Sequence, residues 1–228
     1  MASGTDSHTP WAAPSPLPSG CRTERVRLRY WQPADAPAML QALSVDRPSF
    51  LPWLPWTATD NRTVEECGAA IERQRLKRER LDPPADDFTI AISDARSGDV
   101  LGGTGLHRII HGAHEAEIGY WMRADRRRQG LCQEAVAALV TWAFRSPVEG
   151  GWGLRRIHIR CASLNAASRQ VPQRLGFVHE ATLRKERWVD GLGWDDTLVF
   201  GMLRDEWRGE PAGLTIDRQG APNGAHGT

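Results

Sequence analysis

The chain has 228 residues, of which 29 are basic and 28 acidic, so its formal net charge is +1. This length suits one domain with a substantial core, and the balanced charge excludes a general electrostatic attraction to nucleic acid or to a membrane surface. Apolar runs stay below the roughly 18 residues that span a bilayer, and the N-terminus lacks the order of a signal peptide, so we expect a cytoplasmic protein.

Both ends of the chain have the composition of unstructured segments. Residues 1–20 carry four prolines among Ser, Ala and Gly, and residues 209–228 are rich in Gly, Pro and polar side chains. Such segments bury too little apolar surface to offset the entropy lost on ordering. We therefore expect a disordered arm over residues 1–20, one domain over residues 21–208 and a disordered tail.

Between the ends, the hydrophobic period changes repeatedly between two and about 3.6, which predicts a mixed α/β domain. The predicted strands cover residues 25–31, 88–93, 100–110, 115–122, 155–161, 177–187 and 194–203. One helix is predicted to begin at a cap on Asp35, and a second runs from the capping box at residues 63–66 to about residue 80. Two further helices are predicted over residues 129–145 and 165–175.

The cysteines and histidines do not form a metal-binding pattern. The four cysteines lie far apart without C-x-x-C spacing, which predicts reduced thiols and argues against disulfides and a zinc site. His107, His111 and His114 lie across a predicted hairpin, with no acidic or cysteine ligands to complete a set. We therefore expect no metal.

Residues 126–132, Arg-Arg-Arg-Gln-Gly-Leu-Cys, lie where a predicted strand ends and the long helix begins. The first N–H groups of a helix have no partner within it, so this junction can receive a phosphate-bearing ligand. Gly130 allows the backbone to approach such a ligand closely, and the arginines add positive charge. A basic run before a helix is also a common solvated turn, so the order of the neighbouring elements is needed to choose between a phosphate-binding loop and such a turn.

A second pattern, Asn165-Ala-Ala-Ser168, follows the predicted strand at residues 155–161. Asn165 can cap the next helix, which places Ser168 in its first turn. Pro172 has no N–H for the carbonyl of Ser168 four residues earlier, so we expect that carbonyl to be free. The same pattern also serves as an ordinary structural cap.

In this order, the motifs resemble the GCN5-related N-acetyltransferases (GNAT). The strand at residues 116–121 is followed by Arg127-x-x-Gly130-x-Cys132, which is similar to the Gln/Arg-x-x-Gly-x-Gly/Ala loop that binds the acyl-CoA pyrophosphate. Cys132 replaces the usual Gly or Ala. Residues 165–177 resemble the RimJ/RimL branch, the ribosomal-protein serine or alanine N-acetyltransferases, and the resemblance extends over roughly residues 22–208.

This resemblance implies a fold with one twisted, mostly antiparallel sheet of about seven strands, flanked by about four helices. The fourth and fifth strands of that fold, here residues 115–122 and 155–161, splay apart and admit the pantetheine arm of the coenzyme. The family expectation also includes a homodimer.

The resemblance further implies the parts of the site. Acetyl-CoA, as the acyl donor, would contact Tyr120, Trp121, Met122, Arg127, Arg128, Gln129, Gly130, Leu131, Cys132, Asn165 and Ser168. An N–H group within residues 120–122 would stabilise the oxyanion, Asn165 would contact the pantetheine, and Ser168 would protonate the departing thiolate.

Two further features concern the acceptor amine. An α-amino group titrates at about 8, so it needs only a modest base, and Glu117 is our candidate, with Glu186 as a weaker one. Either glutamate can instead be an ordinary paired carboxylate. Trp53 and Trp56 can form a wall of the acceptor cleft or pack beneath a loop.

The sequence thus predicts an N-acetyltransferase that acts on the N-terminal amino group of a protein, with a ribosomal protein as the family-based choice. One alternative acceptor is a small amine such as an antibiotic or a polyamine. A second alternative is a non-catalytic acyl-CoA sensor, although a sensor would not need the leaving-group acid Ser168. The donor can also be succinyl-CoA or another short acyl-CoA, because the sequence does not give the size of the acyl pocket.

Overall fold

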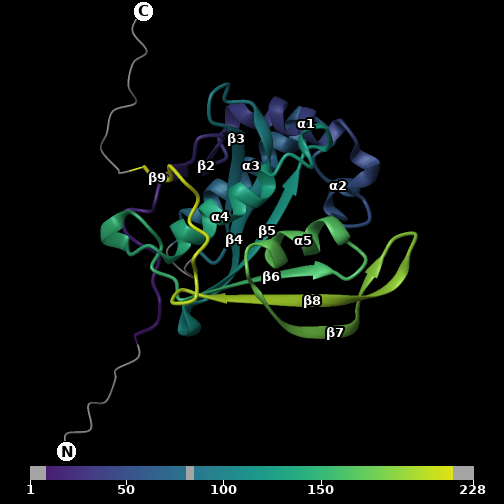
Figure 1. Ribbon diagram of the computed structural model, residues 1–228. Helices are drawn as coiled ribbons and strands as arrows, with labels where there is room; N and C mark the ends of the chain where they lie inside the picture. Colours follow the sequence, from purple (N-terminus) through teal and green to yellow (C-terminus); the bar gives the residue numbers. More distant parts are fainter. Residues whose placement is uncertain (1–8, 81–84, 218–228) are drawn as a thin grey trace, which may run out of the picture.

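A single mixed sheet of nine strands forms the centre of the computed structural model, which describes residues 9–80 and 85–217 (Figure 1). The strands cover Gly20–Arg22 (β1), Val26–Tyr30 (β2), Phe88–Asp94 (β3), Val100–Ile110 (β4), Glu115–Met122 (β5), Arg156–Ala162 (β6), Val178–Val189 (β7), Gly193–Leu203 (β8) and Thr215–Ile216 (β9). Their order in the sheet is β7-β8-β6-β5-β4-β3-β2-β1-β9.

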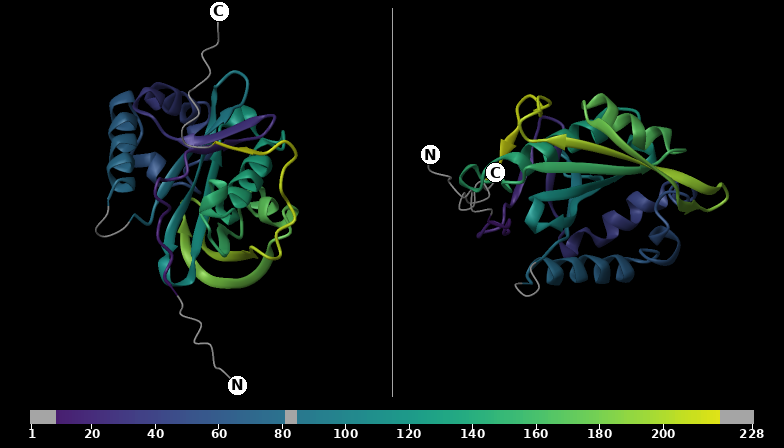
Figure 2. Two further views of the ribbon diagram at one scale, coloured as in Figure 1. Left: turned by 90° about the vertical axis from the view of Figure 1, so that its left-hand side faces the viewer. Right: turned by 90° about the horizontal axis from the view of Figure 1, so that it is seen from below.

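Helices cover both faces of the sheet (Figure 2). They comprise Ala36–Ser44 (α1), Trp56–Thr59 (α2), Val64–Arg78 (α3), Leu131–Phe144 (α4) and Ala166–Arg174 (α5). On one face, Leu139 of α4 is fully buried together with Leu28 and Ile118 of the sheet. On the other face, Ile71 of α3 belongs to a smaller apolar cluster that includes Trp31. No helix in the described segments is long and apolar enough to cross a membrane.

The sheet opens between β5 and β6, which are parallel neighbours. They pair only through three positions, Glu115 to Glu117 on β5 and Arg156 to His158 on β6. Because β5 continues to Met122 and β6 continues to Ala162, the two strands part beyond these pairs. The predicted splay of residues 115–122 and 155–161 is thereby confirmed.

The elements differ from the sequence prediction in detail. The two additional strands are β1 and β9, which pair at Cys21 with Ile216 at the edge of the sheet, and α2 is an additional short helix. Asp35 occupies the predicted N-cap position of α1, but its side chain makes no capping hydrogen bond, because the carboxylate instead binds Arg29 at 2.6 Å and accepts a hydrogen bond from the Gln32 N–H at 2.8 Å.

The N-terminal arm is packed on the domain where the structure describes it, so the prediction of a disordered segment is wrong for residues 9–20. Trp11 is only 5% exposed, and its Nε1 donates to the carbonyl of Trp152 at 2.7 Å. Its backbone N–H donates to the carbonyl of His111 at 2.8 Å. A single indole supplies the large apolar surface that the surrounding composition lacks. Residues 1–8 lie outside the described residues.

The tail also departs from the prediction in part, because Thr215 and Ile216 form β9 against β1. The Asp217 N–H then donates to the carbonyl of Gly20 at 2.9 Å. Two segments from opposite ends of the sequence thus complete one edge of the sheet. Residues 218–228 lie outside the described residues.

Replacing Trp11 with alanine is expected to lower the free energy of unfolding by about 3 kcal/mol, since a buried indole and its hydrogen bond are lost. Urea denaturation measures this change. The matched control is Trp188→Ala, which removes an indole that is 59% exposed and should change stability by no more than about 0.5 kcal/mol. Equal effects of the two substitutions would show that the arm does not contribute to stability.

Candidate active site

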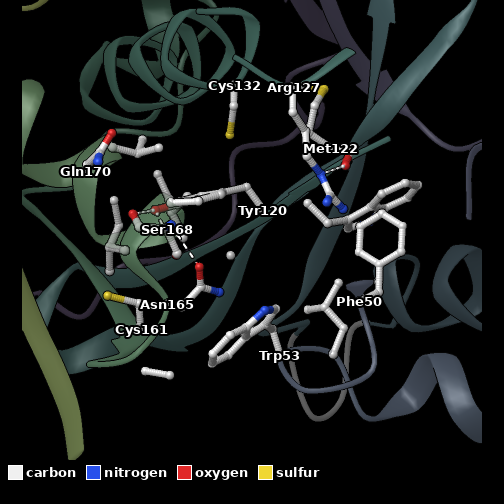
Figure 3. Close-up of a pocket in the computed structure, with 18 of the residues that line it drawn as sticks. Phe50, Trp53, Tyr120, Met122, Arg127, Cys132, Cys161, Asn165, Ser168 and Gln170 are labelled. Carbon is white, nitrogen blue, oxygen red and sulfur yellow. Dashed lines mark hydrogen bonds between the residues drawn. The ribbon is translucent and has the colours of Figure 1, made fainter. Parts of the chain in front are cut away.

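A cavity of about 830 Å³ occupies the opening between β5 and β6 (Figure 3). Cys132 and Gln170 lie at one end, and Trp53 lies at the other, with Tyr120 and Ser168 between them. All the residues predicted to bind substrates line this cavity except Gln129. The structure therefore brings together segments that are far apart in the sequence.

The loop before α4 forms the first end of the cavity. Gly130 is the N-cap of α4 and has a φ of 77°, in the left-handed region that favours glycine. A Cβ atom added there would approach only Nη2 of Arg25, at 3.5 Å. The loop therefore leaves open space beside the first turn of α4, whose N–H groups have no acceptor within the helix.

Arg127 supports this loop from the inside. Its Nε donates to the carbonyl of Met122 at 3.1 Å, and its Nη1 donates to Oγ of Ser49 at 2.9 Å (Figure 3). The guanidinium also lies 4.6 Å from the centre of the Phe50 ring. The sequence prediction placed Arg127 among the residues that contact the coenzyme; its side chain lines the cavity and ties the loop to β5 and to the segment after α1.

Arg25 holds the same loop from the other side. Its Nη1 donates to the carbonyl of Gln129 at 3.1 Å, and its Nε donates to Oε2 of Glu134 at 2.6 Å. Gln129 is thereby turned away from the cavity, and its own Nε2 donates to the carbonyl of Asp125 at 3.3 Å. The sequence contained no local signal for Arg25, because the loop that it holds lies 104 residues away.

Ser168 is held at the middle of the cavity by three hydrogen bonds. Oδ1 of Asn165 accepts from the Ser168 N–H at 3.0 Å, which confirms the predicted cap. The carbonyl of Ser168, which Pro172 leaves without a helical donor, accepts from the Tyr120 hydroxyl at 2.8 Å. Oγ of Ser168 in turn donates to Oη of Tyr120 at 3.3 Å. Burial raises the pKa of Tyr120, so this phenol stays neutral.

Two thiols line the cavity and are protonated at neutral pH. Burial raises the pKa of Cys132 to about 12. Burial also raises the pKa of Cys161, and the charge of Arg187 opposes this only in part. Since the thiolate is the nucleophilic form of cysteine, neither side chain has the properties of a covalent nucleophile.

Glu117 lies where β4 and β5 are distorted by a bulge between His107 and Ile110. Arg108, within the bulge, has a φ of 49° and binds Oε2 of Glu117 at 2.7 Å. Nε2 of His158 lies 3.4 Å from the same oxygen. Burial would raise the pKa of Glu117, but the contact with His158 and the charge of Arg108 outweigh it and hold the pKa below its ordinary value. Glu117 is therefore an ionised, paired carboxylate in the cavity wall.

Glu186 does not line this cavity. Its Oε2 accepts from Oγ1 of Thr197 at 2.6 Å, and its other oxygen pairs with Arg160. The hydrogen bond from Thr197 holds the pKa of Glu186 below its ordinary value. Of the two candidate carboxylates, only Glu117 therefore lines the cavity.

The three histidines considered as metal ligands have separate roles. Nδ1 of His107 lies 2.6 Å from Oδ1 of Asp87. Nδ1 of His111 lies 2.9 Å from the carbonyl of Trp11, and Nε2 of His114 lies 2.8 Å from that of Thr9, so both contact the N-terminal arm. Among the residues that the structure describes, no three potential ligands gather to hold a metal ion.

Replacing Tyr120 with phenylalanine is expected to lower the free energy of unfolding by about 1 kcal/mol, because the Ser168 carbonyl loses its donor. Tyr30 provides a matched control, since its buried hydroxyl has no hydrogen-bond partner in the part of the chain that the structure describes. The substitution Tyr30→Phe should therefore be neutral or stabilising. Thermal or urea unfolding of the two variants distinguishes them, and a Tyr120→Phe protein as stable as Tyr30→Phe would contradict this geometry.

Comparison with known proteins identifies a family and several relatives of this chain. The model of the acetyltransferase (GNAT) domain family matches residues 25–178. The "Putative ribosomal N-acetyltransferase YdaF" of Bacillus subtilis (strain 168) is 27% identical over 187 residues, which cover 82% of this chain and 96% of that protein. The "Ribosomal-protein-serine acetyltransferase" of Escherichia coli (strain K12) is 29% identical over 110 residues, 48% of this chain and 58% of that protein.

Solved structures show the same fold. The structure titled "RimL- Ribosomal L7/L12 alpha-N-protein acetyltransferase in complex with Coenzyme A" has a TM-score of 0.69 at 21% identity, covering 79% of this chain and 95% of its own. The ribosomal-protein-S5-alanine acetyltransferase from Vibrio fischeri also has a TM-score of 0.69 at 21% identity, covering 83% and 98%. The chain therefore belongs to the acetyltransferase (GNAT) family, and its fold is that of the RimJ/RimL-type acetyltransferases.

Proposed function

We propose that this chain is a cytoplasmic, acetyl-CoA-dependent N-acetyltransferase that modifies the N-terminal amino group of a protein, a ribosomal protein being the first choice. One observation carries the proposal: a single cavity joins the N-terminus of α4 to Ser168 through the opening between β5 and β6. The names of the relatives, two of which are ribosomal N-acetyltransferases, support the choice of acceptor.

The first end of the cavity fits the diphosphate of a coenzyme A donor. The free N–H groups of the first turn of α4 and the open space at Gly130 provide a backbone anion site. Arg126 and Arg128 line the same end and supply positive charge. Related folds have been solved with coenzyme A and, for the microcin C7 self-immunity acetyltransferase MccE, with acetyl-CoA and AMP.

The free edge of β5 fits the pantetheine arm and the thioester. Strand pairing with β6 ends at Glu117, so within the described residues the next part of β5, up to Met122, has no neighbouring strand on that side. Unpaired backbone N–H and C=O groups require partners, and an extended chain of amides can provide them. An N–H of this edge can also stabilise the negative charge that develops on the thioester oxygen.

In the proposed reaction, the neutral amine attacks the thioester carbon, and the C–S bond then breaks. The nitrogen loses one proton to a base, the departing thiolate gains a proton from the hydroxyl of Ser168, and Ser168 regains a proton from solvent while the base releases its own. Asn165 and Tyr120 act as positioning residues, because their hydrogen bonds fix the backbone of Ser168. Glu117 is the proposed base, acting directly or through water.

The charges of the cavity wall favour an N-terminal amine over a polycationic small molecule. Glu117 is the only carboxylate among the described residues that line the cavity, and Arg108 already neutralises it. The arginines of the wall are Arg108, Arg126, Arg127, Arg128, Arg160, Arg174 and Arg187. A polyamine or aminoglycoside would meet repulsion there. The exposed faces of Trp53 and Trp56 remain available to a peptide.

The direct test compares peptides that carry a free α-amino group with matched peptides whose α-amine is blocked and whose lysine is free. Mass spectrometry should show transfer to the α-amine only.

The variant Ser168→Ala should lower kcat by about 100-fold with little change in acetyl-CoA affinity, because it removes the leaving-group acid. Ser97→Ala, in a turn outside the cavity, is the matched control. Binding of acetyl-CoA without transfer to any amine would favour the sensor alternative.

The pH dependence of kcat/KM should follow the acceptor rather than Glu117. The pKa of Glu117 is lowered, so this carboxyl is fully ionised throughout the pH range in which the α-amine titrates. The rate should thus rise as the α-amine loses its proton, at about pH 8. Glu117→Gln should lower the rate by about tenfold or more at each pH without moving this limb. Glu186→Gln is the control, and equal rates for both variants would exclude Glu117 as the base.

A further inference from the structure

Arg187 is a cation in the cavity wall for which the described residues supply no ion-pair partner. It lies on β7 and lines the cavity together with Cys161 and Asn165. Its charge acts on the thiol of Cys161, whose side chain lies beside Asn165 in Figure 3. Nε of Arg187 is buried, and no atom of residues 9–80 or 85–217 forms a hydrogen bond with it.

The carboxylates near Arg187 are engaged elsewhere. Asp195, its neighbour across the strand pair, accepts from Oγ of Ser163 at 2.6 Å and from the Leu164 N–H at 3.2 Å. Glu186, its neighbour in sequence, pairs with Arg160. Arg187 itself forms no ion pair within the described part of the chain.

Two further carboxylates near the end of the β7–β8 hairpin are engaged in the same way. Asp196 accepts from the Lys185 N–H at 2.9 Å, and Asp190 accepts from Nε1 of Trp188 at 3.1 Å. None of these carboxylates forms an ion pair with Arg187, although its charge reaches Glu186 and helps to hold the pKa of that carboxyl below its ordinary value. A buried donor left without an acceptor is costly, and such groups are typical of sites that meet a ligand.

The other arginines of the wall differ from Arg187 in partner or in position. Arg108 pairs with Glu117, and Arg160 pairs with Glu186. Arg126, Arg127 and Arg128 belong to the loop before α4. Arg174 lies one turn beyond Gln170, which is itself at the Cys132 end of the cavity. Arg187 is thus a separate positive site, away from the region assigned to the diphosphate.

We propose that Arg187 binds a carboxylate in the part of the cavity that Cys161 and Asn165 line. The proposal rests on the proposed transferase function and refines its substrate class. The carboxylate has two possible sources. It can belong to an acidic side chain within the first residues of the acceptor peptide, or it can be the terminal carboxylate of a dicarboxylic acyl group carried by the coenzyme.

The acceptor arm of the test uses two peptides that differ only by Asp or Asn at the second position, with acetyl-CoA as the donor. If the acceptor supplies the carboxylate, wild-type kcat/KM should favour the Asp peptide by about tenfold, because a charge-assisted hydrogen bond is lost with Asn. The variant Arg187→Met should reduce this ratio to about one. Arg184→Met, on the same strand but outside the cavity, should preserve it.

The donor arm compares succinyl-CoA with butyryl-CoA, which have acyl chains of similar length and differ in the terminal carboxylate. Calorimetry measures their affinities, and transfer to the Asn peptide measures their rates. If the donor supplies the carboxylate, wild type should prefer succinyl-CoA, and Arg187→Met but not Arg184→Met should remove the preference.

The outcomes separate this proposal from the proposed function. Ratios that are unchanged in Arg187→Met in both arms would overturn the carboxylate site. If Arg187→Met does not fold, Arg187→Lys replaces it and should reduce the same ratio, because lysine lacks the planar pair of donors. Failure of wild type to acylate any peptide would contradict the transferase instead, and the calorimetric comparison of the two donors would still test Arg187.

Discussion

The separation of β5 from β6 is the constraint on which the rest of the site depends. A parallel pair that stops after three positions leaves backbone groups of a central strand without partners, which a folded protein tolerates only where a ligand or water can satisfy them. The opening is bridged at one point, where the Tyr120 hydroxyl of β5 binds the Ser168 carbonyl of α5. That carbonyl is available because Pro172 cannot donate to it. The proline and the tyrosine therefore set the position of α5 relative to β5.

The loop at the first end of the cavity is held by side chains and not by regular structure. Arg25 and Arg127 fix its carbonyl groups and its neighbours from opposite sides, while Gly130 permits the turn into α4. These contacts fix the conformation of the loop before α4, and they leave the N–H groups of the first turn of α4 available to an anion.

Much of the fold and part of the site could be predicted, because the signals were local. The period of the apolar residues located the seven longer strands, and the Asn165 cap and the effect of Pro172 followed from backbone chemistry at neighbouring positions. The docking of Trp11, the bond from Arg25 to Gln129 and the unpaired state of Arg187 could not be predicted, since each depends on residues far away in the sequence. Asp35 shows the same limit: its sequence suited a cap, but Arg29 on the neighbouring strand competes for its carboxylate.

Amide hydrogen exchange with and without acetyl-CoA tests the central claim most directly. If the donor lies along the open edge of β5 and against the start of α4, exchange should slow at residues 118–122 and 128–133, and the β4–β5 turn at residues 111–114, which contacts the N-terminal arm, should be unaffected. Protection restricted to other parts of the protein, or none at saturating acetyl-CoA, would contradict the assignment of this opening as the donor site.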